Sequence, residues 1–407
     1  MSQEQRVLML VNTHVYDDPR VVAEGVALVK HGYQVTVIGA ARLGGVATRG
    51  TLDGMDVTLS PMVTTRHPLR LLVAVWHLLR GNVGSVTHKP PSMQTNIISF
   101  IFFILWAIRL GWKSPAVVIH AHDLSPLPAA WLLARWHRAR LVYDSHESAA
   151  DFYPGRKGQL MAWLERRLIG KADRVITVGD KLAADLRVRG AKHVTVIGNW
   201  KRLELFSIDP SRLETERQRL GLAAYSLVIV FIGDLTPTVY ELRPLLTAVS
   251  QSPQVALLIG GRGGLQEEIQ QMAEQASNIF WFGYVNYADV PLYTTLADIV
   301  YCCISPDFLQ SRYVVPNKLF EAFAAGRPLF AHRGVGEIGD MLEKIPAAVI
   351  LDEVTAERLK DAFQHLEDPD LRQNLHHAAL QGRELYHWQV AETRLLELYQ
   401  SLTPYNR

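Results

Sequence analysis

Two successive sets of short β-rich runs, each alternating with helical patterns, predict an α/β protein with two doubly wound parallel sheets. The chain has 407 residues, more than one hydrophobic core usually organises, so two domains of about 200 residues each are expected. Hydrophobic residues make up 48% and charged residues 20%, a composition typical of globular proteins. Sheets of this kind bind ligands at the carboxyl ends of their strands, so we expect functional residues in the loops that follow them.

The strands of each set are expected in chain order. Those of the first set are expected at residues 6–11, 34–38, 117–120, 141–143, 175–178 and 194–197. Those of the second set are expected at residues 227–232, 255–259, 279–282, 299–303, 328–331 and 348–351. Helices are expected at 21–30, 211–219 and 388–402. The irregular residues 198–206 predict the crossing between the two domains, and two such domains imply a cleft between them.

Residues 315–328 indicate a short helix whose first turn combines backbone amides, a cation and a carboxylate. Pro316 suits the first helical position, Gly326 suits a left-handed cap, and a proline two residues later prevents continuation. Free N–H groups and the positive end of the dipole favour a phosphate at the helix start, where Lys318 adds charge and Glu321 shares its face. The stretch therefore predicts a site for a nucleotide diphosphate, with Glu321 accepting hydrogen bonds from hydroxyls. The alternative is an ordinary amphipathic helix with an ion pair between Lys318 and Glu321.

The motif Pro-Asn-Lys-Leu-Phe-Glu at 316–321, followed by Ala-Ala-Gly-x-Pro at 324–328, resembles the donor-site helix of retaining GT-B glycosyltransferases, broadly glycosyltransferase family 4. The resemblance extends over nearly the whole chain. It implies two Rossmann-like domains facing a central cleft: an acceptor-binding domain at 1–203 and a donor-binding domain at 204–385, with 386–407 as a helix that returns to the first. It also implies that a sugar moves from a nucleoside diphosphate sugar to a hydroxyl with retention at the anomeric carbon.

The loop after the first strand lacks the Gly-x-Gly-x-x-Gly of dinucleotide-binding proteins, so a nicotinamide-dependent dehydrogenase loses its main support. Asp18 and Arg20 in this loop match an Asp-x-Arg pattern that faces the cleft in the resembling branch. We therefore expect both on the acceptor side. The alternative is that Asp18 caps the following helix and Arg20 is solvated.

Two further loops place histidines beside carboxylates: His120, His122 and Asp123 after one strand, and His146 and Glu147 after the next. His120 and His122 could share one side of an extended segment and hold a metal with Asp123, although no known zinc spacing is met. In the resembling family a His lies at the end of the strand-to-helix turn that corresponds to the second of these loops, and His146 occupies that position. His146 is therefore predicted to face the acceptor and the transferred sugar, with His122, Asp123 and Glu147 beside it. A buried structural His is the alternative.

In the second domain the family places a glycine turn and then a basic residue around the donor phosphates. Gly233 and Arg243 match these positions, although a proline replaces the family's glycine after the basic residue. Asp234 stands where many relatives carry Arg, so one phosphate-binding cation is missing by that comparison. Arg262 is the expected substitute, or else it is a surface residue.

The largest departure from the family concerns its pair of glutamates eight residues apart. Glu321 matches the second, but Tyr313 stands in place of the first. A phenol can still hydrogen-bond a hydroxyl, so sugar preference is the property that this departure affects. The remaining residues predicted to bind the donor are Tyr284, Val285, Pro316 and Asn317.

The residues predicted to be catalytic are His146, Lys318, Arg243 and Glu321. The cations and the helix start would stabilise the leaving diphosphate, and no Asp-x-Asp lies among the residues expected at the donor site, so we expect neither a metal nor a cofactor. The expected setting is cell-surface polysaccharide or glycolipid synthesis, with a glycan or lipid-linked acceptor and no nucleic acid. Two other classes remain open. One is a non-catalytic sugar-nucleotide-binding subunit, suggested by the departures from the family, and the other is a sugar-nucleotide epimerase of the same fold.

The net charge of +2 conceals an acid-free block. Residues 57–122 contain no Asp or Glu, but they contain Arg66, Arg70, Arg80, Lys89, Arg109 and Lys113. Apolar stretches at 71–79 and 97–108 lie within it, too short for a spanning helix, which needs about 20 residues. Either they are buried in the core, or they enter one leaflet with Trp76, Trp106 and Trp112 at headgroup depth. The block therefore predicts docking on an anionic membrane surface.

Cys302 and Cys303 are adjacent in an apolar run, which predicts a reduced, buried strand pair. The first residues lack a basic region leading into a long apolar segment, as a signal peptide would have. We therefore expect a cytoplasmic protein, peripheral on the inner face of the plasma membrane if the acid-free block binds lipid.

Overall fold

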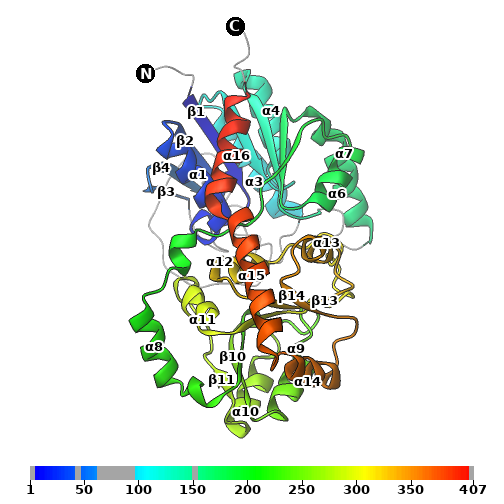
Figure 1. The fold of residues 1–407 in the computed structure, drawn as a ribbon. Coiled ribbons are helices and arrows are strands. Elements are labelled where there is room, and N and C mark those ends of the chain that lie inside the picture. The colour runs from blue at the N-terminus through cyan, green and yellow to red at the C-terminus, as the bar shows by residue number, and fades with distance from the viewer. Residues whose placement is uncertain (1–4, 42–46, 62–96, 149–154, 403–407) are drawn as a thin grey trace. The chain divides into compact units, whose positions relative to one another are not determined.

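The computed structural model describes residues 5–41, 47–61, 97–148 and 155–402. The chain divides into two compact units: unit 1 comprises Met1–Ile197 and Glu392–Arg407, and unit 2 comprises Gly198–Ala391. The observed crossings thus follow residues 197 and 391, where the sequence predicted 203 and 385. Each unit has its own sheet, covered by helices (Figure 1).

Unit 1 is built on an eight-stranded sheet with the order β3-β4-β2-β1-β5-β6-β7-β8. Neighbouring strands run parallel except β3 and β4, which pair antiparallel. The strands are β1 (Arg6–Val11), β2 (Gln34–Ala40), β3 (Thr48–Leu52), β4 (Met55–Ser60), β5 (Val118–His122), β6 (Arg140–Ser145), β7 (Arg174–Thr177) and β8 (Val194–Val196). β1 and β5 are buried along nearly their whole length, as central strands covered on both faces must be.

The sequence did not predict the hairpin of β3 and β4. β3 is mostly exposed, so it lacks the apolar run that marks a buried strand. Asp53 and Gly54 connect the two strands with φ angles of 48° and 85°, which is the backbone conformation of a tight hairpin turn. This Asp-Gly pair was the local signal for the hairpin.

The helices of unit 1 are α1 (Pro19–Lys30), α3 (Ile97–Gly111), α4 (Leu127–His137), α6 (Gly155–Leu168), α7 (Asp180–Val188) and, from Glu392 onward, α16 (Trp388–Gln400). The step from β1 to β2 runs along the sheet opposite to the steps from β4 to β5 and onward. Because such crossovers are right-handed, α1 covers one face of the sheet and α3, α4, α6 and α7 cover the other. α16 lies on the α1 face, where Tyr399 forms a hydrogen bond with His120 of β5 (Figure 1).

α3 contains the second apolar stretch, and the structure divides it between core and surface. Phe102, Phe103 and Trp106 are buried, whereas Leu105 and Trp112 are about half exposed. Of the two alternatives for Trp106, burial in the core is confirmed and headgroup depth is not, because its ring stacks on Phe102 in the core. None of the helices described is long and apolar enough to cross a membrane. Several residues of the acid-free block lie outside the described residues: 71–79 with Trp76, Arg66, Arg70, Arg80 and Lys89.

Unit 2 is built on a six-stranded parallel sheet with the order β11-β10-β9-β12-β13-β14. Its strands are β9 (Leu227–Asp234), β10 (Val255–Arg262), β11 (Ile279–Trp281), β12 (Ile299–Cys302), β13 (Leu329–His332) and β14 (Ala348–Leu351). Its helices are α8 (Pro210–Arg219), α9 (Leu242–Ser250), α10 (Gln266–Gln275), α11 (Val290–Leu296), α12 (Asn317–Ala325), α13 (Gly336–Lys344), α14 (Ala356–His365) and α15 (Pro369–Leu385).

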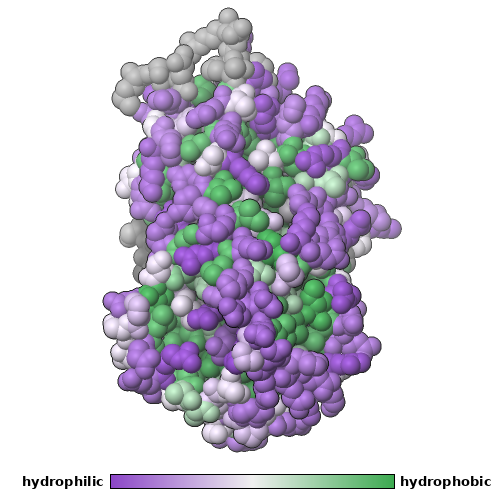
Figure 2. Space-filling view, in the orientation of Figure 1, coloured by the Kyte–Doolittle hydropathy of each residue, from purple (hydrophilic) through white to green (hydrophobic). Residues whose placement is uncertain are grey.

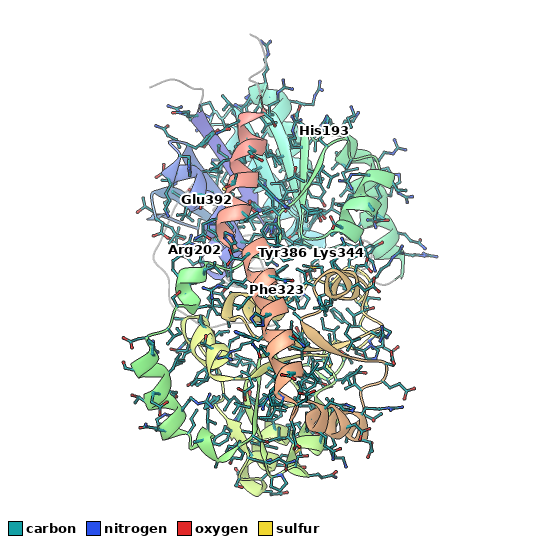
Figure 3. All side chains as sticks on the ribbon, viewed as in Figure 1. His193, Arg202, Phe323, Lys344, Tyr386 and Glu392 are labelled. Carbon is teal, nitrogen blue, oxygen red and sulfur yellow. The ribbon has the colours of Figure 1, made fainter. Side chains whose placement is uncertain are left out.

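α12 is the helix that the sequence predicted to hold a phosphate, and most of its residues are buried. Gly326 ends it with a φ of 64°, as the sequence predicted for a left-handed cap. Phe323 stacks on Tyr386 just after α15, with ring centroids 5.9 Å apart and planes within 17° (Figure 3). This packing fixes the orientation of α12, and hence where its first turn points.

The two cysteines are free and buried, as predicted, but only Cys302 lies in a strand, because β12 ends there. Burial raises the pKa of Cys302 to about 12. Both thiols are therefore protonated and unreactive at neutral pH.

Candidate functional site

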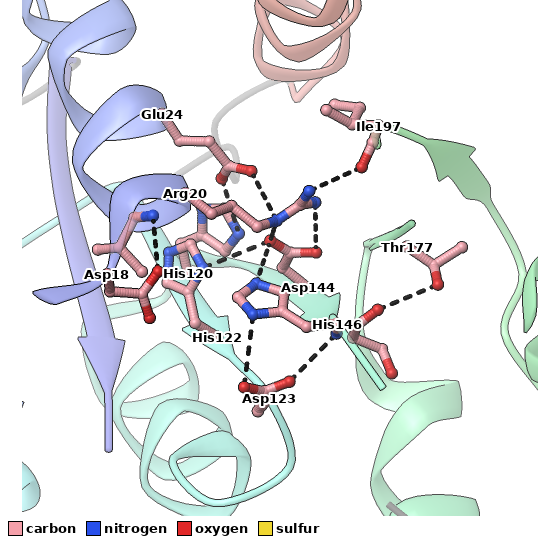
Figure 4. Close-up of polar contacts among 12 residues, drawn as sticks. Asp18, Arg20, Glu24, His120, His122, Asp123, Asp144, His146, Thr177 and Ile197 are labelled. Carbon is pink, nitrogen blue, oxygen red and sulfur yellow. Dashed lines mark hydrogen bonds and ion pairs between the residues drawn. The ribbon is translucent and has the colours of Figure 1, made fainter. Parts of the chain in front are cut away.

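Unit 1 gathers a buried polar cluster at the carboxyl ends of β5 and β6 (Figure 4). The sequence predicted strands that end at residues 120 and 143, which leaves His122 and Asp144 in the loops after them. The structure corrects this, because the parallel pairing of β5 with β6 continues to His122 and Asp144. The side chains of His120, His122 and Asp144 therefore project from the sheet itself and are fully buried.

Asp144 is the centre of this cluster. Arg20 binds it with two hydrogen bonds, from Nε to Oδ2 at 2.8 Å and from Nη2 to Oδ1 at 2.9 Å, and donates from Nη1 to the carbonyl of Ile197. Burial alone would raise the pKa of Asp144, but the charge of Arg20, with His146, holds it well below its usual range. The alternative in which Arg20 is solvated is thus wrong: its side chain is 8% exposed and anchored in the cluster.

His146 lies just after β6 and contacts two carboxylates. Its Nε2 is 2.9 Å from Oδ2 of Asp144 and its Nδ1 is 3.5 Å from Oδ2 of Asp123, while Oδ1 of Asp123 accepts a hydrogen bond from the His146 backbone. Burial opposes protonation of the ring, but these two carboxylates outweigh it and raise the pKa of His146 to about 10. At neutral pH the side chain is therefore an imidazolium, which donates hydrogen bonds and cannot act as a base.

Glu24 and the two strand histidines complete the cluster, and sequence reasoning did not assign Glu24 or Asp144 a role. Ligand atoms of Glu24, His120, His122 and Asp144 all lie within 4.8 Å of one another. Carboxylates and imidazoles are metal ligands, but here the guanidinium of Arg20 lies 3.3 Å from Glu24 as well as 2.8 Å from Asp144. The positive charge beside these carboxylates is thus the guanidinium of Arg20, at the place where a metal ion would otherwise supply it. Burial and the neighbouring Asp144 raise the pKa of Glu24 to about 7, against the opposing effect of Arg20.

The other predicted acceptor residues lie at the edge of this cluster. Asp18 caps α1 by accepting a hydrogen bond from the backbone of Val21 at 3.3 Å, so the capping alternative is confirmed. Glu147 is exposed, and its carbonyl accepts a hydrogen bond from Ser145. The spacing of Arg20 and Glu24, four residues apart on α1, was the signal that could have revealed the missed glutamate.

In unit 2, Lys318 of α12 extends over the carboxyl end of β9. Its Nζ lies 4.3 Å from the ring centre of Phe231 and 4.7 Å from that of Tyr240. A Cβ at Gly233 would overlap Nζ, and a Cβ at Gly261 of β10 would overlap the carbonyl of Gly233. The two glycines therefore allow the ammonium and the backbone to approach closely. Burial lowers the pKa of Lys318, although Glu321 opposes the shift. No hydrogen-bond partner of Nζ is found among the described residues.

Glu321 faces a different cation from the one expected. The Nζ of Lys201 is 3.7 Å from Glu321, donates to Oδ1 of Asn317 at 2.7 Å, and contacts the hydroxyl of Tyr287 at 3.2 Å. Lys201 is 7% exposed and was missed by sequence reasoning. It lies in the irregular segment after β8, 116 residues before Asn317, so no local spacing could have connected the two. No Lys318–Glu321 ion pair occurs in the described part of unit 2.

The other predicted cations of the donor site are placed at the surface. Arg243 is exposed and pairs with Glu268 of α10, with Nη2 2.8 Å from Oε2. The guanidinium of Arg262 lies 3.9 Å from the ring centre of Tyr284, which is itself about half exposed. Asp234 accepts two hydrogen bonds from Thr236, so it closes the turn after β9.

The structure also places the remaining predicted donor residues. Pro316 is the N-cap of α12, with ψ 147°, so the helix begins at Asn317 and not at the proline. Tyr313 is buried and has the guanidinium of Arg312 5.1 Å from its ring centre. Val285 follows the turn at Gly283 and approaches Gly260 of β10 closely.

Comparisons with known proteins agree with this arrangement. Residues 19–200 match the family described as Glycosyl transferase 4-like domain, and residues 213–381 match the family described as Glycosyl transferases group 1. A D-inositol 3-phosphate glycosyltransferase of Jonesia denitrificans is 25% identical over 316 residues, which are 71% of this chain and 72% of that protein.

Solved structures share the fold over almost the whole chain. Sucrose-phosphate synthase from Thermosynechococcus elongatus superposes with a TM-score of 0.72 at 16% identity, covering 97% of this chain and 98% of that one. Alr3699/HepE from Anabaena, solved in complex with UDP-glucose, has a TM-score of 0.69 at 15% identity and covers 97% and 100%. With both halves matched by glycosyltransferase domains, the chain belongs to the GT-B glycosyltransferases of the family 4 type.

Proposed function

We propose that the protein transfers a sugar from a nucleoside diphosphate sugar to a hydroxyl acceptor, with retention at the anomeric carbon and without a metal ion. The observation that carries this proposal is the ammonium of Lys318, held over Gly233 at the start of α12 without a hydrogen-bond partner among the described residues. A buried cation of this kind is costly unless an anion completes its environment. A diphosphate would do so, and it could also accept hydrogen bonds from backbone amides at the start of the helix.

The leaving group of such a transfer is a diphosphate, so catalysis needs stabilisation of developing negative charge more than a strong acid. Lys318 would contact this charge directly. Glu321, held beside Lys201, would accept hydrogen bonds from hydroxyls of the donor. Arg243 would contribute only after release from Glu268, so we assign it the smaller part.

His146 is proposed for the acceptor side, with Arg20, His122 and Asp123 around it. As an imidazolium it has two N–H groups, and Nε2 is held by Asp144 at 2.9 Å. Nδ1, at the longer distance of 3.5 Å from Asp123, would therefore donate a hydrogen bond to the acceptor or to the transferred sugar in place of that contact. Its contacts with Asp123 and Asp144 fix the ring in one orientation, which is the condition for a positioned donor.

For the acceptor we propose a glycan or a lipid-linked glycan of the cell surface, reached from the cytoplasmic face of the membrane. The acid-free composition of residues 57–122 supports the lipid-linked choice, because it removes the repulsion that anionic headgroups would exert.

Turnover with purified protein tests the proposal. Nucleoside diphosphate sugars are incubated with simple hydroxyl acceptors, and NMR of the product gives its anomeric configuration. An inverted product would contradict retention, and epimerised donor without acceptor would indicate an epimerase instead.

Replacement of Lys318 tests the site itself. Lys318→Met removes a charge-assisted contact to the leaving diphosphate, and we expect transfer to slow by about two orders of magnitude with an unchanged melting curve. The control is Lys344→Met, because Lys344 ends α13 at the surface. If Lys318→Met turned over as fast as the parent, Lys318 would not be the residue that contacts the leaving diphosphate.

A further inference from the structure

One face of unit 1 combines exposed apolar side chains with unopposed positive charge. α3, α4 and α6 cover the same face of the sheet, and α4 packs against both of the others. Seven large apolar side chains on or next to these helices are between 45% and 56% exposed: Ile101, Leu105, Trp112, Leu132, Trp136, Leu160 and Trp163. We call this surface the α3–α4–α6 face.

The exposed apolar side chains of this face are distributed over all three helices, and we call them the apolar strip. The rings of Trp112 and Trp136 stack with centroids 3.5 Å apart, which joins the end of α3 to the end of α4. On α6, Leu160 and Trp163 share one side of the helix with Arg156 and Arg167, at spacings of three and four residues. The guanidinium of Arg167 lies 5.3 Å from the ring centre of Trp163. Aromatic rings beside long cationic chains suit the depth at which a bilayer changes from apolar to charged.

The charge of this face has one sign. Exposed cations lie along it, namely Arg109, Lys113, Arg135, Arg138, Arg156, Arg166 and Arg167. The three helices contain a single acid, Glu165, and it is buried. Its two oxygens accept hydrogen bonds from Tyr143 at 2.7 Å and Arg189 at 2.6 Å, so it does not oppose the surface charge.

We propose that the α3–α4–α6 face docks unit 1 on an anionic lipid bilayer, with the tryptophans at headgroup depth and the arginines against the phosphates. The inference rests on the proposed function only in that a lipid-linked acceptor gives the docking a purpose. It also extends the acid-free block, because α4 and α6 lie beyond residue 122. Neither part binds strongly alone: the strip is too small for deep insertion, and surface charge is screened within about 8–10 Å in physiological salt. Together they give reversible attachment.

Vesicle co-sedimentation of the full chain tests the proposal. Vesicles of phosphatidylcholine alone are compared with vesicles that also contain phosphatidylglycerol, at low and at high salt. We expect at least tenfold tighter binding to the anionic vesicles at low salt, and a loss of this difference as salt rises. Equal binding to both vesicle types at low salt would overturn the proposal.

Variants assign the binding to this face. The triple variant Arg135→Gln, Arg156→Gln, Arg167→Gln is expected to bind anionic vesicles roughly 100-fold more weakly, following the contribution of each cation near an anionic surface. A triple variant of equal charge change, Lys192→Gln, Lys344→Gln, Arg358→Gln, alters exposed residues outside the face and is expected to bind as the parent does. If the two triple variants bind alike, the face is not the docking surface.

The apolar strip is tested by Trp136→Ala with Trp163→Ala, against Leu309→Ala with Leu385→Ala, whose residues are equally exposed in unit 2. Only the tryptophan pair is expected to weaken vesicle binding. A concentration-dependent dimer in solution that the tryptophan variant abolishes would instead identify the occupant as a second copy, and would overturn the proposal. Transfer to a soluble acceptor is expected to be unchanged in every variant, so a failure of lipid binding and a failure of the proposed transfer are distinguishable.

Discussion

Asp144 and Lys318 both carry buried charges, but their surroundings differ. Arg20 satisfies the carboxylate of Asp144 with two hydrogen bonds, so this charge is compensated within the protein. Lys318 faces two aromatic rings and finds no hydrogen-bond partner in the described part of the chain. A buried pair of the first kind holds a structure together. A buried cation of the second kind favours the binding of an anion.

Protonation of His146 should make stability depend on pH. Its folded pKa of about 10 lies above the unfolded value of about 6.5, so its stabilising effect is complete below pH 6.5 and is lost as pH rises toward 10. We expect the free energy of unfolding to differ between the parent and His146→Gln by a few kcal/mol at pH 6, and by much less at pH 10. Urea unfolding across this range measures the difference.

The control for this experiment is His193→Gln, because His193 is an exposed histidine of the same unit (Figure 3). A stability difference that His146→Gln shows equally at pH 6 and pH 10 would mean that the ring is not held as an imidazolium.

At the level of elements, the occurrence and order of the buried strands could be predicted, whereas the residue at which each strand ends could not. All twelve expected strands occur, each within two residues at its ends except β10, which continues three residues further to Arg262. Apolar runs bounded by turns indicate buried strands reliably. They do not show how far a strand continues through polar residues, and this is why His122 and Asp144 were placed in loops. β3 and β4 lacked an apolar run of this kind.

The same limit explains the site residues that were missed. Lys318, Glu321 and Gly233 could be predicted because a helix start and a strand end are local features. Lys201 and Asn317 meet only through the tertiary fold. Arg243 was expected at the donor phosphates from the resemblance, which does not show its partner Glu268 on another helix. Local sequence gives the chemistry of a side chain, whereas its partners come from packing.

The first turn of α12 depends on Lys201, which suggests a variant at this scale. Lys201→Met leaves Oδ1 of Asn317 and the carboxylate of Glu321 without their shared cation, and a buried polar group that loses its partner costs about 1–3 kcal/mol. We expect the KM for the donor to rise about tenfold or more while kcat changes less, because the residue acts on the helix and not on the leaving group. Steady-state kinetics measures both.

Lys192→Met is the matched control, since Lys192 is exposed in unit 1. A lower kcat with an unchanged KM in Lys201→Met would instead assign Lys201 to the chemical step.

On the scale of the whole molecule, the proposed membrane contact lies on the surface, whereas the candidate sites of the two units are buried. The surface that each unit turns to the viewer in Figure 2 is mostly hydrophilic, with apolar residues in separate patches. The α3–α4–α6 face differs because its helices lack any exposed acid. Each unit also encloses its own site: compensated charges in unit 1 and an uncompensated ammonium in unit 2.

Because unit 2 holds its own candidate phosphate site on its own sheet, a nucleoside diphosphate should stabilise the chain without a metal. At 100 times its dissociation constant a ligand contributes about 2.7 kcal/mol, and each kcal/mol shifts the melting temperature of a unit of about 200 residues by roughly 2–4 °C. We expect this shift to be the same in EDTA as in magnesium, since the diphosphate would be held by the cation of Lys318 and by hydrogen bonds from the backbone amides of α12. Differential scanning fluorimetry of the parent and of Lys318→Met measures it, and the variant should lose most of the shift in both buffers. A shift that requires magnesium in the parent would mean that the diphosphate is bound as a metal complex, and Lys318 would then have only a supporting part.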